Sequence, residues 1–522
     1  MTEHVPHVVM MVVNDVATDT RVKKEALALA QAGLRVTVVG AASESMAAGS
    51  WVGPVEIVRV PVDFAIRDRA ALPPGPTLVQ RVLDPAAEAR AKARIAGRER
   101  DVSTRATLAP RPGSAGGPNV AVFKLGVAER KLERLVLRGL REAARVHGGL
   151  SRRVARRLAA RAAAAAGTTA VRWRVEHPVV LDYEVAFGPV VDALLPDVIH
   201  AHDMHLVSVA AHARSRARAA GRDVPWVYDA HEYVRGLSQY GARTPTVIAG
   251  WADLEAEFIR DAARVITVSP AIADELQRVY GLSERPSVVL NIPTADPPGP
   301  EPVRPLRDVC GLGPDVPLLS YSGGMTRARG VHTAIDAMVE LPEAHLGLVC
   351  VPHNDTWFVR QLRKQVADMG LGDRVHFVNP VGPGQVVEYL RGVDVGLIPI
   401  LSYASHEMAL PNKLFEYLHA GVPVVSSELQ SLGEFLRATG VGVTFPPEDA
   451  KALAAAVRVV LADHERFAAA AGDPELLATY SWSRQADELR RVYAGLLGRE
   501  LAARSDLSEE IIDLIELARR PA

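Results

Sequence analysis

The first forty residues alternate between apolar and polar segments in a way that predicts a strand, a helix and a second strand. Residues 8–13 and 34–40 are apolar runs, and residues 21–32 between them carry apolar side chains at helical spacing and end at Gly33. The apolar positions of this helix are Val22, Ala26, Leu29 and Ala30. Because strands buried on both faces read as continuous apolar runs, this alternation indicates a parallel sheet covered by helices.

The same alternation returns after residue 195, and a linker divides it. Residues 291–305 hold six prolines, which exclude both a helix and a central strand there. Predicted strands precede the linker at 198–201, 224–228, 265–268 and 288–290, and follow it at 318–322, 345–351, 375–378, 393–398 and 422–426. We expect an α/β protein with two doubly wound, Rossmann-like domains facing a central cleft, because open parallel sheets bind ligands beyond the carboxyl ends of their strands.

Residues 62–177 interrupt this pattern and are rich in alanine and arginine. Residues 81–180 hold 22 Lys and Arg against 8 Asp and Glu, whereas the whole chain has 60 against 61. We predict a basic helical insertion in the first domain. Two interpretations stay open: a solvated helical hairpin, or a basic surface that docks an anionic membrane lipid or a phosphate-bearing acceptor.

Composition excludes several function classes. A formal net charge of -1 excludes a wholly basic nucleic-acid binder, and we expect no nucleic-acid partner. The two cysteines, Cys310 and Cys350, form no Cys-x-x-Cys pair, which excludes a zinc ribbon and a disulfide scaffold. Residues 8–13 lack the flanks of a signal peptide, and no apolar run approaches the ~18 residues of a membrane span. We therefore expect a cytoplasmic protein whose membrane contact, where it exists, is peripheral at the inner face.

The segment with the clearest chemistry is residues 405–427. Asn412 is expected to cap a short helix over residues 413–420. The free N–H groups at the start of such a helix suit phosphate or sugar oxygens. Glu416, one turn into the helix, is placed to accept two ribose hydroxyl hydrogens; taken alone, it is also explained as a partner of the helix dipole. The residues expected to face inward are Leu414, Phe415 and Leu418.

This segment resembles the donor-binding signature of retaining glycosyltransferases with the GT-B fold, especially family 4. The signature has two glutamates separated by seven residues, a small-residue helix end and Gly-x-Pro-Val-Val. Glu416 matches the second glutamate and residues 420–425 match the tail, but Met408 holds the first glutamate position. Either Glu407, one residue away, reaches the donor sugar, or backbone groups just after it do. The residues expected to line the sugar are Glu407, Met408, Ala409 and Leu410.

Residues 321–331, YSGGMTRARGV, resemble the strand, loop and helix with which the family grips the donor pyrophosphate through an arginine and a lysine. Arg329 takes the lysine position and keeps the charge on a fork that suits phosphate. Gly324 holds the arginine position, so Arg327 or Lys413 is expected to supply the missing charge. The expected donor contacts are Gly323, Gly324, Arg327, Arg329, Asn412 and Lys413.

The first domain carries the expected contacts to the sugar and the acceptor. Residues 197–205, DVIHAHDMH, resemble the family's strand end with a histidine that faces the donor sugar. Alternation along the strand puts His200 and His202 on one side, and His202 is preferred because it lies nearer the carboxyl end. The residues expected on the acceptor side are Arg21, Asp229 and His231.

The resemblance also implies a division into domains. Residues 1–295 form an acceptor-side domain that carries the insertion at about 62–177, and residues 306–478 form the nucleotide-sugar domain. Residues 479–500 are expected to form a helix that crosses back to the first domain. The resemblance does not cover the tail, where residues 501–522 are expected to form a further helix.

The implied activity is transfer of a sugar from a nucleotide-diphospho-sugar to an acceptor hydroxyl with retention of anomeric configuration. The chain has no Asp-x-Asp motif, so we expect no metal and no cofactor; Arg329 and the helix N-terminus then neutralise the leaving diphosphate. His202, Arg329 and Glu416 are the expected catalytic residues. The acceptor stays open between a saccharide, a lipid-linked intermediate and a small natural product.

Two other functions fit the same residues. One is a sugar-nucleotide epimerase or a phosphorylase on this two-domain architecture. The other is a catalytically decayed, membrane-associated binding module, in which Met408 and Gly324 mark lost catalytic positions.

Overall fold

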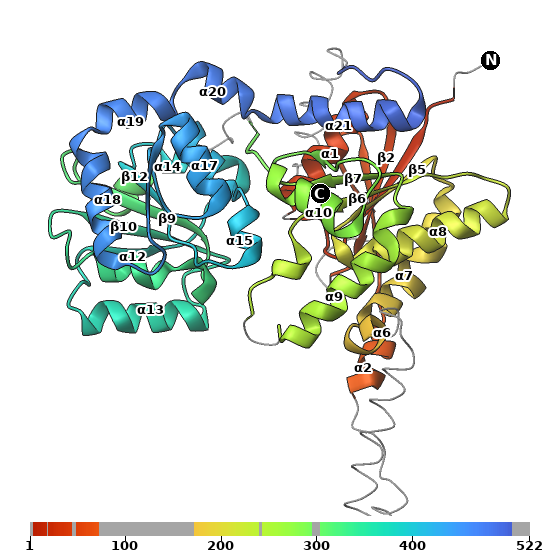
Figure 1. Ribbon diagram of the computed structural model, residues 1–522, viewed down its shortest axis with the longest axis horizontal. Helices are drawn as coiled ribbons and strands as arrows, with labels where there is room; N and C mark the ends of the chain where they lie inside the picture. Colours follow the sequence, from red (N-terminus) through yellow and green to blue (C-terminus); the bar gives the residue numbers. More distant parts are fainter. Residues whose placement is uncertain are drawn as a thin grey trace, which may run out of the picture. The chain divides into compact units, whose positions relative to one another are not determined.

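The computed structural model describes residues 4–17, 19–43, 49–71, 172–239, 243–294 and 303–503 (Figure 1). Most of the expected basic insertion and nearly all of the expected tail helix lie outside the described residues. Met1–Ile66 and Arg172–Ala522 together form one compact unit, and Arg67–Val171 form another. The first unit contains two β-sheets.

Eight strands form the first sheet, in the order β3-β4-β2-β1-β5-β6-β7-β8. Neighbouring strands are parallel, except that β3 and β4 form an antiparallel pair at one edge. The strands are β1 (His7–Met11), β2 (Arg35–Ala41), β3 (Gly49–Val52), β4 (Val55–Val60), β5 (Val198–His202), β6 (Trp226–Ala230), β7 (Arg264–Thr267) and β8 (Ser287–Val288). Every residue of β1, β5 and β6 is buried, including the polar residues His200, His202 and Asp229, so these strands form the centre of the sheet.

Helices cover both faces of this sheet. They are α1 (Thr20–Gln31), α6 (Arg172–Glu176), α7 (Val179–Leu194), α8 (Val207–Ala219), α9 (Pro245–Phe258) and α10 (Pro270–Tyr280), with 3₁₀ turns η2 (Met204–Leu206), η3 (Val234–Gly236) and η4 (Ile259–Asp261). A further short helix, α2 (Ala65–Ala71), is mostly exposed. Helix α1 begins where the Asp19 carboxylate accepts a hydrogen bond from the Val22 N–H, and its buried face includes Leu29. Helices α7 and α8 pack on the opposite face.

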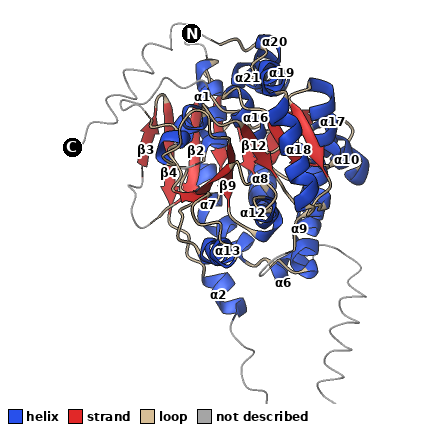
Figure 2. Cartoon of the chain, turned by 90° about the vertical axis from the view of Figure 1, so that its left-hand side faces the viewer, coloured by secondary structure: helices blue, strands red, loops and turns tan. Residues whose placement is uncertain are grey.

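Six parallel strands form the second sheet, in the order β11-β10-β9-β12-β13-β14. The strands are β9 (Leu318–Gly324), β10 (His345–Val351), β11 (Val375–Val378), β12 (Val395–Ile398), β13 (Val424–Ser427) and β14 (Gly442–Phe445). Two separate apolar clusters lie on its two faces. In Figure 2 helices lie on both sides of the strands.

The helices of the second half of the chain include the segment singled out in the sequence. They are α11 (Leu306–Val309), α12 (Val331–Ala337), α13 (Trp357–Asp368), α14 (Val386–Leu390), α15 (Ala404–Met408), α16 (Asn412–His419), α17 (Gln430–Thr439), α18 (Ala450–Ala462), α19 (His464–Ala471), α20 (Pro474–Thr479) and α21 (Trp482–Leu497), with 3₁₀ turns η5 (Arg327–Arg329) and η6 (Pro383–Gln385). In α16, Leu414, Phe415 and Leu418 are fully buried, as their spacing predicts.

The last helix of the described residues, α21, packs on the first sheet rather than on the second. Its residues Leu489 and Tyr493 share one apolar cluster with Val8 and Met10 of β1. The side-chain oxygen of Gln485 also accepts a hydrogen bond from the backbone N–H of Leu290, at 2.9 Å. Among the described residues, no helix is both long enough and apolar enough to cross a membrane.

The predicted fold class, two doubly wound α/β sheets, is confirmed. The sequence pattern did not predict the β3–β4 hairpin or β14. In each sheet the strand order reverses beside the first strand, between β1 and β5 and between β9 and β12. Ligands of open α/β sheets bind beyond the carboxyl ends of the strands at such points.

Candidate functional site

A buried lysine lies at the carboxyl end of β9. The ammonium group of Lys413, from the first turn of α16, lies 3.4 Å from the ring centroid of Tyr321 and hydrogen-bonds to no described residue. Burial, and then the nearby charge of Arg329, lower the pKa of Lys413 well below that of an ordinary lysine. Gly323 makes room for this ammonium, since a Cβ there would lie 3.1 Å from it, and its φ of 138° also favours glycine.

Arg329 supplies a second cation at this strand end. It follows β9 in η5, and its guanidinium makes no hydrogen bond or ion pair within the described ranges. The next residue, Gly330, has a φ of 67°, and a Cβ there would lie only 1.7 Å from the carbonyl oxygen of Pro399. This close approach fixes the turn that carries Arg329. Among the described residues neither cation forms a direct ion pair, and one of them is buried, so the site favours an anion.

The start of α16 adds backbone donors to these charges. The expected capping role of Asn412 is wrong: Pro411 is the N-cap, Asn412 is the first helical residue, and no side chain caps the helix. The first N–H groups of α16 are therefore open to an anion. Tyr417, one turn further on, supports the strand end, because its hydroxyl donates to the Ser320 carbonyl at 2.9 Å and accepts from the Ser322 N–H at 3.2 Å.

Glu416 is partly buried on the same helix. Burial raises the pKa of its carboxyl group, against the opposing charge of Lys413. Its carboxylate hydrogen-bonds to no other residue in the described part of the chain, so both oxygens are available to a ligand. The expected ribose role of Glu416 stays a prediction.

Glu407 has structural partners of its own. Its carboxylate accepts hydrogen bonds from the Ser402 hydroxyl at 2.5 Å and from the Gln430 N–H at the start of α17, at 2.9 Å. The neighbouring Met408 packs against the core of the first domain, and its carbonyl accepts a hydrogen bond from the Ser269 hydroxyl at 2.5 Å. Of the two interpretations given for this loop, these contacts favour the backbone groups after Glu407.

The other expected donor contacts lie along the same two loops. Gly324 and Arg327 are exposed, and the Gly324 carbonyl accepts a hydrogen bond from Tyr321 at 2.8 Å. Ala409 and Leu410 are partly buried between α15 and α16. These placements leave their expected contacts with a donor as predictions.

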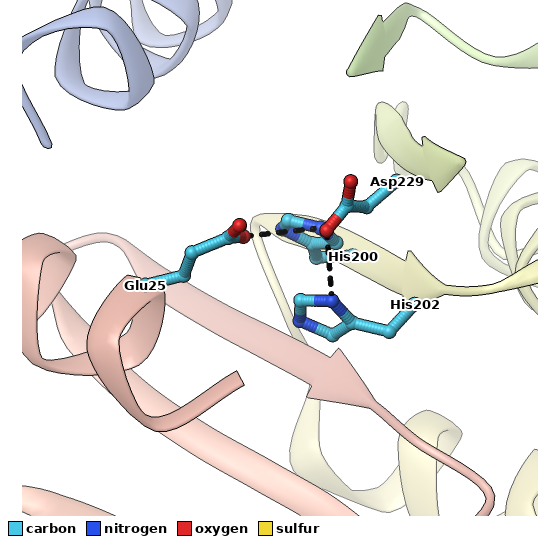
Figure 3. Close-up of side chains that lie close together, drawn as sticks. All are labelled: Glu25, His200, His202 and Asp229. Atoms are coloured by element: carbon cyan, nitrogen blue, oxygen red, sulfur yellow. Dashed lines mark hydrogen bonds and ion pairs between the residues drawn. The ribbon is translucent and has the colours of Figure 1, made fainter. Parts of the chain in front are cut away.

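In the first domain, the expected histidine lies at the end of β5 and meets a carboxylate from the next strand. The parallel register pairs His202 with Asp229, and the Nδ1 atom of His202 lies 3.1 Å from Asp229 Oδ2 (Figure 3). His231 Nε2 lies 3.0 Å from the same oxygen. Arg21 donates to both oxygens of Asp229 at 2.8 Å.

The charges of this cluster follow from these contacts. Burial opposes ionisation of Asp229, but Arg21 and the histidines overcome it and hold its pKa well below the usual range. Burial also opposes protonation of His231, but Asp229 raises the pKa of that imidazole to about 9. For His202 burial prevails and lowers the pKa. With Nδ1–H donating to Asp229, His202 presents an unprotonated Nε2, which is buried and has no partner among the described residues.

The residues expected on the acceptor side are brought together, but at different depths. Arg21 and Asp229 are 3% and 0% exposed and hydrogen-bond to each other, whereas the His231 side chain is 23% exposed. Direct acceptor contact therefore fits His231 better than the other two. Sequence reasoning missed Glu25, Tyr321, Tyr417 and Tyr493; for Glu25 the signal was its position one helical turn after Arg21.

Comparisons with known proteins place this chain in a family. Residues 316–463 match the family described as Glycosyl transferases group 1, and residues 155–292 match Glycosyltransferase Family 4. The glycogen synthase of Mycobacterium tuberculosis is 29% identical over 57% of this chain and 68% of its own length. D-inositol 3-phosphate glycosyltransferase 1 of Catenulispora acidiphila is 27% identical over 57% of this chain and 72% of its own.

Solved structures show the same fold at low sequence identity. Sucrose-phosphate synthase from Thermosynechococcus elongatus has a TM-score of 0.61 at 16% identity, covering 94% of this chain and 99% of its own. Anabaena HepE in complex with UDP-glucose has a TM-score of 0.52 at 14% identity, covering 94% and 100%. The two family matches together span more than half of the chain, and with this fold they show that it belongs to the family 4-like, group 1 glycosyltransferases of the GT-B type.

Proposed function

We propose that this glycosyltransferase moves a sugar from a nucleotide-diphospho-sugar to an acceptor hydroxyl, with retention of anomeric configuration and without a metal. The observation that carries the proposal is the pair of cations at the end of β9. Lys413 and Arg329 lie within electrostatic reach of each other, form no ion pair or side-chain hydrogen bond in the described part of the chain, and adjoin the uncapped start of α16. A diphosphate supplies the charge that this site lacks.

Departure of the nucleoside diphosphate is the step that these groups assist. As the bond to the sugar breaks, negative charge develops on the diphosphate, and fixed cations and N–H groups stabilise it without reorganising. Arg329, Lys413 and the first N–H groups of α16 together supply what a metal supplies in other glycosyltransferases. Glu416, whose carboxylate is unoccupied by other described residues, binds the ribose hydroxyls.

His202 acts on the sugar. Its unprotonated Nε2 accepts a hydrogen bond from a sugar hydroxyl, and Asp229 keeps the ring in the required tautomer. Retention is supported by the family 4 resemblance. The acceptor is a saccharide, a lipid-linked intermediate or a small natural product; relatives named for glycogen and for inositol 3-phosphate favour a polyhydroxylated one.

A thermal-shift screen of the full chain with UDP-, GDP-, dTDP- and ADP-sugars tests the proposal. A ligand at 100 times its Kd stabilises the folded state by about 2.7 kcal/mol. We expect one nucleotide class to stabilise the wild type and not Lys413→Met, with EDTA without effect. Conversion of the donor without any acceptor would instead identify an epimerase, and stabilisation by no sugar nucleotide would favour the binding module.

A further inference from the structure

Helix α21, the last one in the described residues, reaches the histidine cluster through one tyrosine. Tyr493 in α21 is fully buried, and its hydroxyl lies 2.8 Å from Nδ1 of His200. The two residues are 293 positions apart in sequence. A buried phenol needs a hydrogen-bond partner, and His200 provides one.

His200 in turn contacts His202 directly. The rings stack with centroids 4.2 Å apart and an interplanar angle of 17°. The second ring nitrogen of His200, Nε2, faces the carboxylate of Glu25 (Figure 3), and the two groups lie 3.8 Å apart. His200, which Tyr493 of α21 holds in place, therefore packs against one face of the His202 ring.

A second set of contacts leads from His200 to the same ring through polar side chains. Glu25 lies 3.0 Å from Arg21, and Arg21 binds both oxygens of Asp229. Asp229 then holds Nδ1 of His202. Stacking and this polar chain thus reach His202 from two directions.

These side chains are also close enough to suggest a cation site, but their chemistry argues against one. Ligand atoms of Glu25, His200, His202 and Asp229 lie within 4.8 Å of one another. Arg21 already occupies both Asp229 oxygens and contacts Glu25, so a divalent cation would lie beside a fixed positive charge. A metal lies in the plane of each imidazole that binds it, and two nearly parallel stacked rings do not meet this condition at one ion.

We propose that Tyr493 and His200 are positioning residues for His202, so that the C-terminal helix sets the orientation of the histidine that binds the donor sugar. The sugar-binding role of His202 rests on the proposed function; the positioning of its ring does not. Neither Tyr493 nor His200 touches substrate in this assignment.

Tyr493→Phe tests the proposal because it removes the hydroxyl and keeps the ring. Tyr280→Phe is the matched control: it removes another buried phenol of the first domain, one that donates to Glu255 at 2.6 Å. We expect Tyr493→Phe to lower kcat roughly tenfold, the order expected for one lost hydrogen bond, while the KM for the donor changes little. The control should lose thermal stability by a similar amount and keep kcat.

A double-mutant cycle separates positioning from general destabilisation. His200→Phe keeps a ring against His202 and removes the partner of Tyr493. Tyr493→Phe and His200→Phe combined should then lower kcat no further than either change alone. Fully additive losses, or unchanged kcat in Tyr493→Phe, would overturn the proposal.

A readout without turnover keeps this test separate from the proposed function. In protein labelled with ¹⁵N-histidine, Tyr493→Phe should shift the ring resonances of His202 and the control should not. If Tyr493→Phe shifts these resonances but the wild type turns over no sugar nucleotide, the positioning is upheld and the sugar-transfer role is rejected. Unshifted resonances would reject the positioning. Thermal stabilisation of the wild type by Co²⁺ that is lost in His200→Phe would also reject it, because His200 would then bind a cation.

Discussion

The ammonium group of Lys413 lies over the ring of Tyr321, 3.4 Å from its centroid, and within the field of Arg329. The aromatic face offsets part of the cost of burying a cation, and the approach of a second cation adds to that cost. An anion beside Lys413 would offset this cost, and the diphosphate of the proposed donor is such an anion.

Donor binding should therefore be linked to protonation of Lys413. Because the pKa of Lys413 is lowered in the free enzyme, this lysine loses its proton at a lower pH than an ordinary lysine does. A bound diphosphate raises that pKa again. We expect nucleoside diphosphate binding to take up protons once the pH exceeds the lowered pKa. Calorimetry in buffers of different ionisation enthalpy measures this uptake. It should vanish in Lys413→Met and persist in Lys364→Met, which removes an exposed lysine of the same domain; equal uptake in both variants would contradict the prediction.

Glu416→Ala should weaken binding of nucleoside diphosphates without weakening binding of pyrophosphate. The lost hydrogen bonds to ribose are expected to cost about 1–3 kcal/mol, because hydrogen bonds to a charged group lie in this range. Competition assays with both ligands measure the difference. Glu388→Ala, an exposed glutamate paired with Arg391, serves as the control. Equal loss for the two ligands would place Glu416 at the phosphates instead.

Arg329→Ala should act mainly on kcat. Removing one fixed group that stabilises developing charge costs roughly 2–4 kcal/mol, or about 30- to 900-fold in rate. Steady-state kinetics of the variant, beside Arg360→Ala as an exposed arginine of the same domain, measure this loss. Activity that depends strictly on a divalent cation would show that the cationic side chains do not suffice.

The stability of the first domain should fall as the pH rises toward 9. Burial raises the pKa of Glu25 to about 8, and Asp229 raises that of His231 to about 9 against the effect of burial. Both groups bind more protons in the folded state than in the unfolded state, so the free energy of unfolding decreases from about pH 4.5 for Glu25 and from about pH 6.5 for His231.

Denaturant unfolding between pH 5 and 9 measures this dependence. In Glu25→Gln, which keeps the shape of the neutral acid, the decrease between pH 4.5 and 8 should be smaller than in the wild type. In His231→Gln, the decrease in the free energy of unfolding between pH 6.5 and 9 should be smaller than in the wild type. Wild-type slopes in both variants would refute the assignment of these protons.

The sequence predicted most of the fold because its central strands are buried on both faces. β1, β5 and β6 read as apolar runs for that reason, whereas the exposed, alternating residues of β3 gave no such signal. The capping of α16 was mispredicted by one residue because Asn412 is a common cap, while Pro411 fills the position by its fixed backbone angle.

The candidate site was predicted where a local motif or the common edge of neighbouring strand ends locates a residue, as it does for Asp229 and His231. The motifs located Arg329, Glu416 and His202, and alternation placed His200 on the same side as His202. The contact of Tyr493 with His200 joins residues that no local pattern relates. The hydrogen bonds that Glu407 accepts from Ser402 and Gln430 likewise depend on how two loops meet after folding.

The path of α21 has a consequence for biosynthesis. Its residues are translated after both sheets, yet Leu489 and Tyr493 complete the apolar cluster on one face of the first. A ribosome-bound chain therefore carries an uncovered face of its first domain until residues 482–497 have been made, and a nascent chain halted before Trp482 should be retained by chaperones.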